Sequence, residues 1–259
     1  PPSMSLPFKT IFFGILCLTF QLSWCQNDIN VKMHSHNDYH QNIPFWKALS
    51  CGFGSVEADV LLKNDTLFVT HGASEIISNR HIENLYLQPI QKMIRLGMEV
   101  NPTLQLLVDI KSEAQPTLAK LIAVVEKYPE IIMKKNISIV ISGNRPEVSQ
   151  YLEFPDFILF DHQSLEGVAD EIAWNKVALI SLNFKKYSRW DGRQPLTEEE
   201  YKKIKSIIDK AHSLGKSFRF WGIPDTPMSW ETFYAMGLDF INTDDPVGLS
   251  IFMDKISKR

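Results

Sequence analysis

The chain has 259 residues, of which 44% are hydrophobic, and its formal net charge is −3. This composition excludes an intrinsically disordered chain and suits one large domain, or two small ones, with a sizeable core. Lysine and arginine are scattered along the sequence rather than clustered, which is not the electrostatic pattern of a nucleic-acid-binding protein. We therefore expect no nucleic-acid partner.

The first 25 residues differ in composition from the rest of the chain. Lys9 precedes an apolar run at 11–22, and small residues follow that run. These features together are typical of a secretory signal peptide. The run is short for a membrane span, which needs about 20 apolar residues. We therefore expect residues 1–25, with a leader at 1–3, to be removed, so that no stable membrane span remains and the mature protein is secreted or periplasmic.

Cysteine usage bears on how an exported chain would be anchored and stabilised. A lipoprotein anchor on Cys25 is the alternative to a cleaved signal, although Trp24 is bulky where small residues are usual. Removal of residues 1–25 would leave Cys51 as the single cysteine. Such a protein is stabilised by its core or by a metal, without an intrachain disulfide.

Strand-like and helix-like stretches alternate through residues 26–259 without a linker, which predicts a single domain. Most strand candidates are continuous apolar runs, as is typical of parallel strands buried on both faces. We expect helices at 45–50, 82–96, 116–128, 146–153, 198–213, 230–236 and 247–256. We expect strands at 29–34, 55–62 with 67–70, 104–110, 137–142, 157–160, 177–182, 217–221 and 240–242.

Strands alternating with helices in this number favour an α/β fold of the (β/α)8 TIM-barrel type, whose usual size of about 250 residues fits the chain. A doubly wound open sheet is the alternative. The chemistry of a barrel lies where its strands end and its loops begin, so the polar residues that close apolar runs are the first candidates for a site.

The strand at 55–62 carries two carboxylates, Glu57 and Asp59, which alternation places on one face. Carboxylates this close repel each other unless a positive charge lies between them, and oxygen ligands favour a hard cation. We therefore expect one divalent cation, Mg²⁺ or Ca²⁺, at this strand end. A solvated edge strand is the alternative.

The strand at 104–110 ends with a second charged pair, Asp109 and Lys111, which also share a face. Asp109 would add a third carboxylate to the cation site, with a fixed positive charge beside it. The alternative is a structural ion pair at the mouth of the barrel.

The order His36, Glu57-x-Asp59, His71, Asp109-x-Lys111, followed by a polar turn at 243–246, resembles a known superfamily. It is similar to the glycerophosphodiester phosphodiesterases and their wider group, which includes phosphatidylinositol-specific phospholipase C and the sphingomyelinase D-type toxins. The resemblance extends from about residue 32 to 246. It implies that His36 and His71 are the acid–base pair and that Glu57, Asp59 and Asp109 hold the cation.

The resemblance also implies residues that bind substrate. Lys111 would contact phosphate, and Trp221 would occupy the aromatic position after the seventh strand. Many glycerophosphodiesterases have His-Arg-Gly where this chain has His36-Asn37-Asp38, so Asn37 stands where a phosphate-binding arginine is usual. They also often carry glutamate at the position of Asp109. The His-Asn-Asp-Tyr form looks most like a little-characterised bacterial and fungal branch of the superfamily.

The physical chemistry of these residue types agrees with the implied reaction. A phosphodiester anion needs its charge neutralised, a task for the cation and Lys111, while one oxygen loses a proton and another gains one. Two histidines can perform both proton transfers near neutral pH. We therefore expect a secreted, metal-dependent phosphodiesterase acting on glycerophosphodiesters or phospholipid head groups, with loops 72–83 and 185–195 shaping its pocket.

Two other interpretations remain open from the sequence. His34-x-His36 also resembles the metal-binding start of zinc amidohydrolases and related phosphoesterases, for which Asp161-His162 and Asp244 would supply further ligands. The third interpretation is a non-catalytic barrel that binds phosphorylated or sugar ligands through its tryptophans, Trp190, Trp221 and Trp230.

Overall fold

The computed structural model describes residues 31–98 and 103–258. The expected signal peptide at 1–25 lies outside these described residues. No helix in the described part of the chain is long and apolar enough to cross a membrane.

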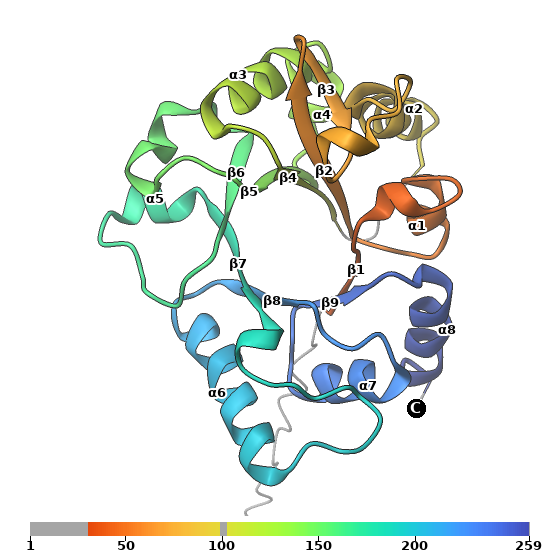
Figure 1. The fold of residues 1–259 in the computed structure, drawn as a ribbon, viewed down its shortest axis with the longest axis vertical. Helices are drawn as coiled ribbons and strands as arrows, with labels where there is room; N and C mark the ends of the chain where they lie inside the picture. The colour runs from red at the N-terminus through yellow and green to blue at the C-terminus, as the bar shows by residue number, and fades with distance from the viewer. Residues whose placement is uncertain (1–30, 99–102, 259) are drawn as a thin grey trace, which may run out of the picture.

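Eight parallel strands form a closed barrel, because the first strand, β1, pairs with both β2 and the last strand, β9 (Figure 1). The ninth described strand, β3 (Thr66–Val69), pairs antiparallel with the end of β2 and extends it as a hairpin. The TIM barrel predicted from the sequence is therefore confirmed. Its parallel strands are β1 (Lys32–Ser35), β2 (Ser55–Lys63), β4 (Leu104–Ile110), β5 (Ile137–Gly143), β6 (Ile158–His162), β7 (Val177–Asn183), β8 (Ser217–Trp221) and β9 (Phe240–Thr243).

Helices surround the barrel on the outside (Figure 1). The α-helices are α1 (Trp46–Ser50), α2 (Gln88–Arg95), α3 (Ala114–Val125), α4 (Pro129–Met133), α5 (Glu171–Asn175), α6 (Glu198–Ser213), α7 (Pro227–Ala235) and α8 (Pro246–Ile256). A π-helical segment, η3 (Glu83–Leu87), leads into α2. The 3-10 segments are η1 (Asp38–His40), η2 (Ala73–Glu75), η4 (Val148–Glu153) and η5 (Phe184–Lys186).

Helix α6 has the bounds expected from its sequence signals. The Thr197 side chain accepts a hydrogen bond from the Glu200 backbone, and the Glu200 side chain accepts one from the Thr197 backbone, so the two form a capping box. Past its end, Gly215 adopts a left-handed conformation with φ of 70°. The apolar stripe that packs α6 on the barrel is Ile204, Ile207, Ile208 and Ala211, all of them buried.

The core has two parts, because a barrel strand buries both of its faces. The main cluster packs the outer strand faces against the helices. A smaller cluster of Leu107, Val140, Leu179 and Phe240 is separate from it. Leu107 lies two residues before Asp109 on β4 and therefore on the same, inward face. Apolar side chains thus fill part of the barrel interior, and polar side chains occupy its carboxyl end.

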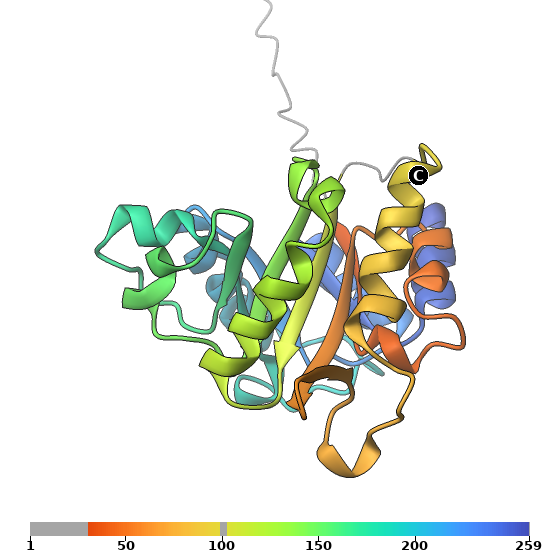
Figure 2. The same ribbon diagram turned by 90° about the horizontal axis from the view of Figure 1, so that it is seen from above.

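Strand register sets the position of the polar end. His34 of β1 lies beside Ser55 of β2, and Asp59 of β2 lies beside Asp109 of β4. The carboxyl ends of these strands therefore meet at one rim. The segment that follows β3 projects beyond this rim (Figure 2).

Candidate active site

The predicted carboxylates lie together at the carboxyl end of the barrel. Glu57, Asp59 and Asp109 each offer an oxygen within 4.8 Å of the other two. Glu57 is 3% exposed and Asp59 is fully buried. Burial raises the pKa of Asp109 to about 6; Lys111 opposes this effect, and the negative charges of Glu57 and Asp59 add to it. Three crowded carboxylates of this kind suit a hard divalent cation.

Glu57 is anchored from inside the barrel by an arginine that the sequence analysis missed. The Nη1 of Arg219, on β8, lies 2.6 Å from Glu57 Oε2, and Arg219 is 3% exposed. Burial acts to raise the pKa of Glu57, but the charge of Arg219 and the hydrogen bond of His34 hold it well below its usual range. The available signal was a single arginine at an inward position of an otherwise apolar strand, Ser217-Phe-Arg-Phe-Trp.

His34 supports the same carboxylate and belongs to the barrel interior. Its Nε2 lies 2.9 Å from Glu57 Oε2, and its Nδ1 lies 2.7 Å from Ser55 Oγ. Burial, together with the charge of Arg219, lowers the pKa of His34 to about 4. His34 is therefore neutral near pH 7 and fully buried, so its contacts hold Glu57 in place.

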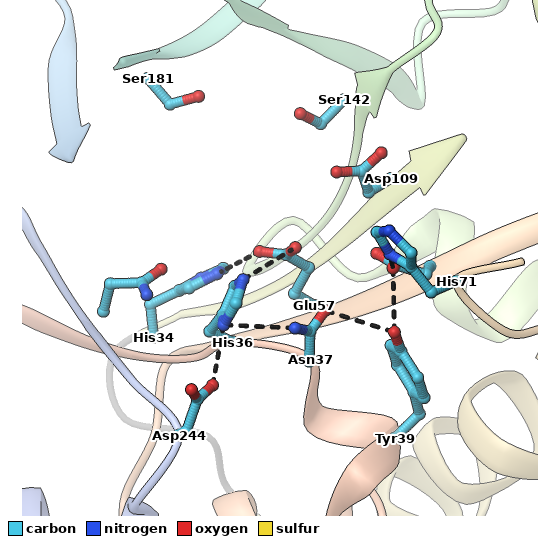
Figure 3. A network of polar contacts seen from close by, with 12 residues as sticks. His34, His36, Asn37, Tyr39, Glu57, His71, Asp109, Ser142, Ser181 and Asp244 are labelled. Carbon is cyan, nitrogen blue, oxygen red and sulfur yellow. Dashed lines mark hydrogen bonds and ion pairs between the residues drawn. The ribbon is translucent and has the colours of Figure 1, made fainter. Parts of the chain in front are cut away.

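His36 stands at the rim, two residues further along the chain. Its Nδ1 lies 2.8 Å from Asp244 Oδ1, and its Nε2 lies 4.0 Å from Glu57 Oε1 (Figure 3). Burial acts to lower the pKa of His36, but the hydrogen bond to Asp244 and the charges of Glu57 and Asp244 raise it above its usual value. A carboxylate that accepts the Nδ1 proton of a histidine leaves Nε2 free for chemistry.

Asp244 is itself held in place after β9. Its backbone N–H donates to Asp225 Oδ2 over 2.8 Å. Asp225 also accepts hydrogen bonds from the Thr243 hydroxyl and from Trp230 Nε1. The loop after β8 thus fixes the residue that orients His36.

His71 approaches the carboxylates from the other side. Its Nδ1 lies 2.7 Å from Asp59 Oδ2, which also accepts a hydrogen bond of 2.9 Å from the Tyr39 hydroxyl. The side chain of His71 is 66% exposed. Figure 3 shows His36 and His71 on either side of Glu57, and both line one cavity of about 650 Å³.

The predicted substrate-binding residues line the same cavity. Lys111 Nζ lies 3.0 Å from Asp109 Oδ2 and 3.3 Å from Asp59 Oδ1, so the ion pair considered as an alternative is present. Asn37 has a left-handed backbone with φ of 45°, a conformation that asparagine tolerates. Trp221 is 38% exposed at the end of β8.

Each of the three carboxylates makes its shortest contact with the protein through one oxygen. Glu57 uses Oε2, Asp59 uses Oδ2 and Asp109 uses Oδ2 for the contacts described above. The Oδ1 atoms of Asp59 and Asp109 are buried and accept no hydrogen bond among the described residues. Buried oxygens without donors are what a cation site provides, so these residues fit a bound divalent ion.

The carboxylates also have a close backbone neighbour that the sequence analysis did not single out. Gly143, at the end of β5, has φ of 67°, and a Cβ there would lie 1.9 Å from Asp109 Oδ1. Only glycine leaves room for the carboxylate in its present position.

The zinc-site ligands considered as an alternative do not converge. Asp161 is buried inside the barrel, where it accepts hydrogen bonds from Ser142 and Ser181. The next residue, His162, points the other way, and its Nε2 lies 3.0 Å from the carbonyl oxygen of Glu166. Within residues 31–98 and 103–258, the one group of three metal-ligating side chains consists of carboxylates and contains no histidine.

Comparison with known proteins agrees with this architecture. The model of the AIM6-like phosphodiesterase domain family matches residues 23–102. The altered inheritance of mitochondria protein 6 of Eremothecium gossypii is 28% identical over 269 residues, which cover 85% of this chain and 69% of that protein. A homologue from Arthroderma benhamiae is 24% identical and covers 84% of this chain and 82% of its own length.

Solved structures share the fold at low sequence identity. A glycerophosphodiester phosphodiesterase from Parabacteroides distasonis superposes with a TM-score of 0.54 at 16% identity, covering 88% of this chain and 98% of its own. A Ca²⁺-dependent phosphatidylinositol-specific phospholipase C from Streptomyces antibioticus has a TM-score of 0.51 at 11% identity, covering 86% and 96%. The superfamily resemblance predicted from the sequence is therefore confirmed, by the match to an AIM6-like phosphodiesterase domain in residues 23–102 and by a barrel that glycerophosphodiester phosphodiesterases and a phospholipase C share.

Proposed function

We propose that this protein is a secreted, metal-dependent phosphodiesterase that hydrolyses glycerophosphodiesters or phospholipid head groups. The observation that carries the proposal is a single cavity in which two histidines flank three clustered carboxylates, with a lysine beside them. The family match and the barrel support a phosphoric diester hydrolase at a coarser level.

The cation would be held by Glu57, Asp59 and Asp109, each of which offers an oxygen within 4.8 Å of the other two. When bound, a divalent ion neutralises charge on the phosphoryl oxygens as the reaction proceeds. Mg²⁺ and Ca²⁺ both suit carboxylate oxygens, and the related phospholipase C from Streptomyces antibioticus is described as Ca²⁺-dependent. Lys111, whose Nζ lies among the same carboxylates, supplies a further positive charge for the phosphate.

The two histidines are arranged for proton transfer. A carboxylate holds the Nδ1 atom of each ring, Asp244 for His36 and Asp59 for His71, so both rings present Nε2 for chemistry. One histidine takes the proton of the attacking hydroxyl or water, and the other gives a proton to the leaving oxygen. Where the head group carries a neighbouring hydroxyl, that hydroxyl is the attacking group and the product is a cyclic phosphate.

Two other residues would complete the binding of substrate. Asn37 lies beside His36, with its Nδ2 3.4 Å from the His36 ring, and can donate to a phosphoryl oxygen. Trp221 offers an exposed indole at the cavity wall, against which the apolar part of a head group can pack.

Secretion belongs to the same proposal and rests on the signal-peptide features of residues 1–25. Intact-mass measurement of the protein from the culture medium or the periplasm tests it. A mass that still includes Met4 to Cys25 would contradict removal of the segment.

The experiment for the activity is a panel of phosphodiesters followed by ³¹P NMR, with the protein first stripped by EDTA and then supplied with Ca²⁺, Mg²⁺ or Zn²⁺. We expect turnover of at least one glycerophosphodiester, loss of activity with EDTA, and recovery with Ca²⁺ or Mg²⁺. Because His36→Ala removes a proposed proton-transfer group while all three carboxylates of the cluster remain, it serves as the inactive control. Full activity in EDTA, or equal activity of the His36→Ala variant, would contradict the proposal.

A further inference from the structure

A second cavity adjoins the one that holds the carboxylates. It has a volume of about 720 Å³, and it shares His36, Lys185 and Gly222 with the first. Its other walls are formed by loop residues between β7 and α6 and between β8 and α7, and by residues at the end of β9. Ligand cavities commonly range from about 300 to 1,000 Å³, so this space can take a group much larger than a phosphate.

The positive charges of this cavity are unpaired. Lys185 and Arg189 line it, and in the described part of the chain neither side chain makes an ion pair or a hydrogen bond with a carboxylate. The stem of Lys185 passes beside Gly222, where an added Cβ would lie 3.8 Å from Lys185 Cε. Lys185 therefore stands at the junction of the two cavities.

The acidic side chains of the cavity, in contrast, already have hydrogen-bond or ion-pair partners within the protein. Asp244 pairs with His36 over 2.8 Å. Asp225 accepts three hydrogen bonds from its surroundings. Asp191 accepts a hydrogen bond of 3.1 Å from the Arg193 backbone and lies 3.7 Å from the Arg193 side chain. Lys185 and Arg189 are therefore the charged side chains of this cavity for which the described residues provide no ion-pair partner.

An aromatic side chain forms a fixed wall beside these cations. Trp190 Nε1 donates to the carbonyl oxygen of Gln194 over 2.6 Å, and the indole packs edge-to-face on Phe184 and Phe233. A fixed indole suits the C–H face of a polyol or sugar ring, which brings an apolar surface together with hydroxyl groups.

We propose that the second cavity binds the head-group arm of the substrate and that this arm is a polyol carrying a second phosphate. The inference rests on the proposed function, because the phosphodiester is bound at the carboxylates while its head group extends past His36. Lys185 and Arg189 bind the second phosphate, and Trp190 packs against the polyol. Two positive charges give such a substrate an advantage over the same compound without the additional phosphate.

The test compares two substrates that differ in one phosphate, glycerophosphoinositol and glycerophosphoinositol 4-phosphate. We expect the ratio of their kcat/KM values to favour the phosphorylated compound on the order of tenfold at low salt and to fall as salt is added. Arg189→Gln should reduce the ratio, and the double variant Lys185→Gln/Arg189→Gln should bring it near one. Lys186→Gln is the matched control, because Lys186 is exposed next to Lys185 but lines neither cavity.

Because the readout is a ratio, a general loss of activity does not imitate the expected result. A ratio near one in the unaltered protein, or a preference that survives in the double variant, would overturn the inference. If the protein turns over neither substrate, calorimetry can compare the binding of inositol 1-phosphate with that of inositol 1,4-bisphosphate. Tighter binding of the bisphosphate that the double variant loses would support the second site while the proposed reaction fails, and equal binding of the two probes would refute the second site.

Discussion

Replacement of Arg219 by glutamine tests the interior support of the carboxylate cluster. The Arg219 Nη1 and Glu57 Oε2 atoms are 2.6 Å apart, and both residues are only 3% exposed. Arg219→Gln leaves the Glu57 carboxylate inside the barrel with a neutral histidine as its nearest partner. Breaking one side of a buried pair costs about 3–5 kcal/mol, because the remaining charge stays buried without compensation. We expect the free energy of unfolding to fall by an amount in this range.

Urea unfolding followed by circular dichroism, in EDTA, measures this loss. The matched variants are Glu57→Gln and the double variant Glu57→Gln/Arg219→Gln. Because the double variant buries neither charge, it should be more stable than the sum of the single losses predicts, by about 2–3 kcal/mol. Added Ca²⁺ should restore more stability to Arg219→Gln than to the unaltered protein, since a bound cation supplies the missing positive charge beside Glu57.

Additivity would refute this reasoning. If the stability losses of the two single variants sum to the loss of the double variant within about 0.5 kcal/mol, Arg219 and Glu57 do not interact energetically, although their side chains lie close together. If Arg219→Gln is as stable as the unaltered chain in EDTA, the guanidinium does not compensate a buried charge.

The remaining predictions concern the histidines and the cation. His36→Ala and His71→Ala should each lower kcat/KM on the order of a hundredfold or more, and the double variant should be little worse because the pair acts as a unit. Asp244→Asn should lower kcat/KM by about 10–100-fold, since the partner of His36 Nδ1 loses its charge; an unchanged value would show that Asp244 does not orient the ring. Asp109→Asn should reduce the bound metal in elemental analysis, and an unchanged stoichiometry would remove Asp109 from the ligand set. Burial lowers the pKa of His34 to about 4, from the value of 6.5 that the side chain has in the unfolded chain. Between these values the unfolded chain binds a proton that the folded chain does not, so stability should fall by about 3 kcal/mol as the pH drops from 6.5 to 4. Urea midpoints measured across this range for the unaltered protein and for His34→Asn check this, because the variant should show a flatter profile.

The sequence predicted the barrel strands well because a strand buried on both faces is a continuous apolar run, which is easy to recognise. The strands β4 and β8 have the expected bounds, 104–110 and 217–221. Helix α6 also has its expected bounds, since a capping box and a glycine mark its two ends.

The short connecting segments were less predictable. The helix expected at 146–153 is a 3-10 segment that begins at Val148, and the helix expected at 82–96 starts with a π-helical turn. The short helices α4 and α5 were not expected, because five residues carry too little periodicity to distinguish a helix from a loop. Helix α3 ends at Val125, and Pro129 begins α4 as its first residue.

The carboxylates of the candidate site could be predicted from the sequence, whereas the partner that holds Glu57 in place could not. Alternation places Glu57 and Asp59 on one face of β2, and parallel pairing of the neighbouring strand β4 brings Asp109 beside Asp59. Arg219 comes from β8, 162 residues away from Glu57, and only closure of the barrel brings its inward side chain to that carboxylate. A lone arginine in an apolar strand signals a buried partner, but the sequence does not say which one.

Contacts between residues far apart in the sequence also decide which carboxylate oxygens can bind a cation. Alternation and the pairing of neighbouring strands place three carboxylates at one rim. A carboxylate with both oxygens taken by protein donors could not serve as a ligand. Arg219 and His34 converge on a single oxygen of Glu57, and His71 meets a single oxygen of Asp59. The Oδ1 atoms of Asp59 and Asp109 accept no hydrogen bond from the described residues, so they are available as ligands for a cation. The long-range partners therefore turn a cluster of acids into a candidate metal site, and they do so through contacts that the spacing of residues in the sequence does not encode.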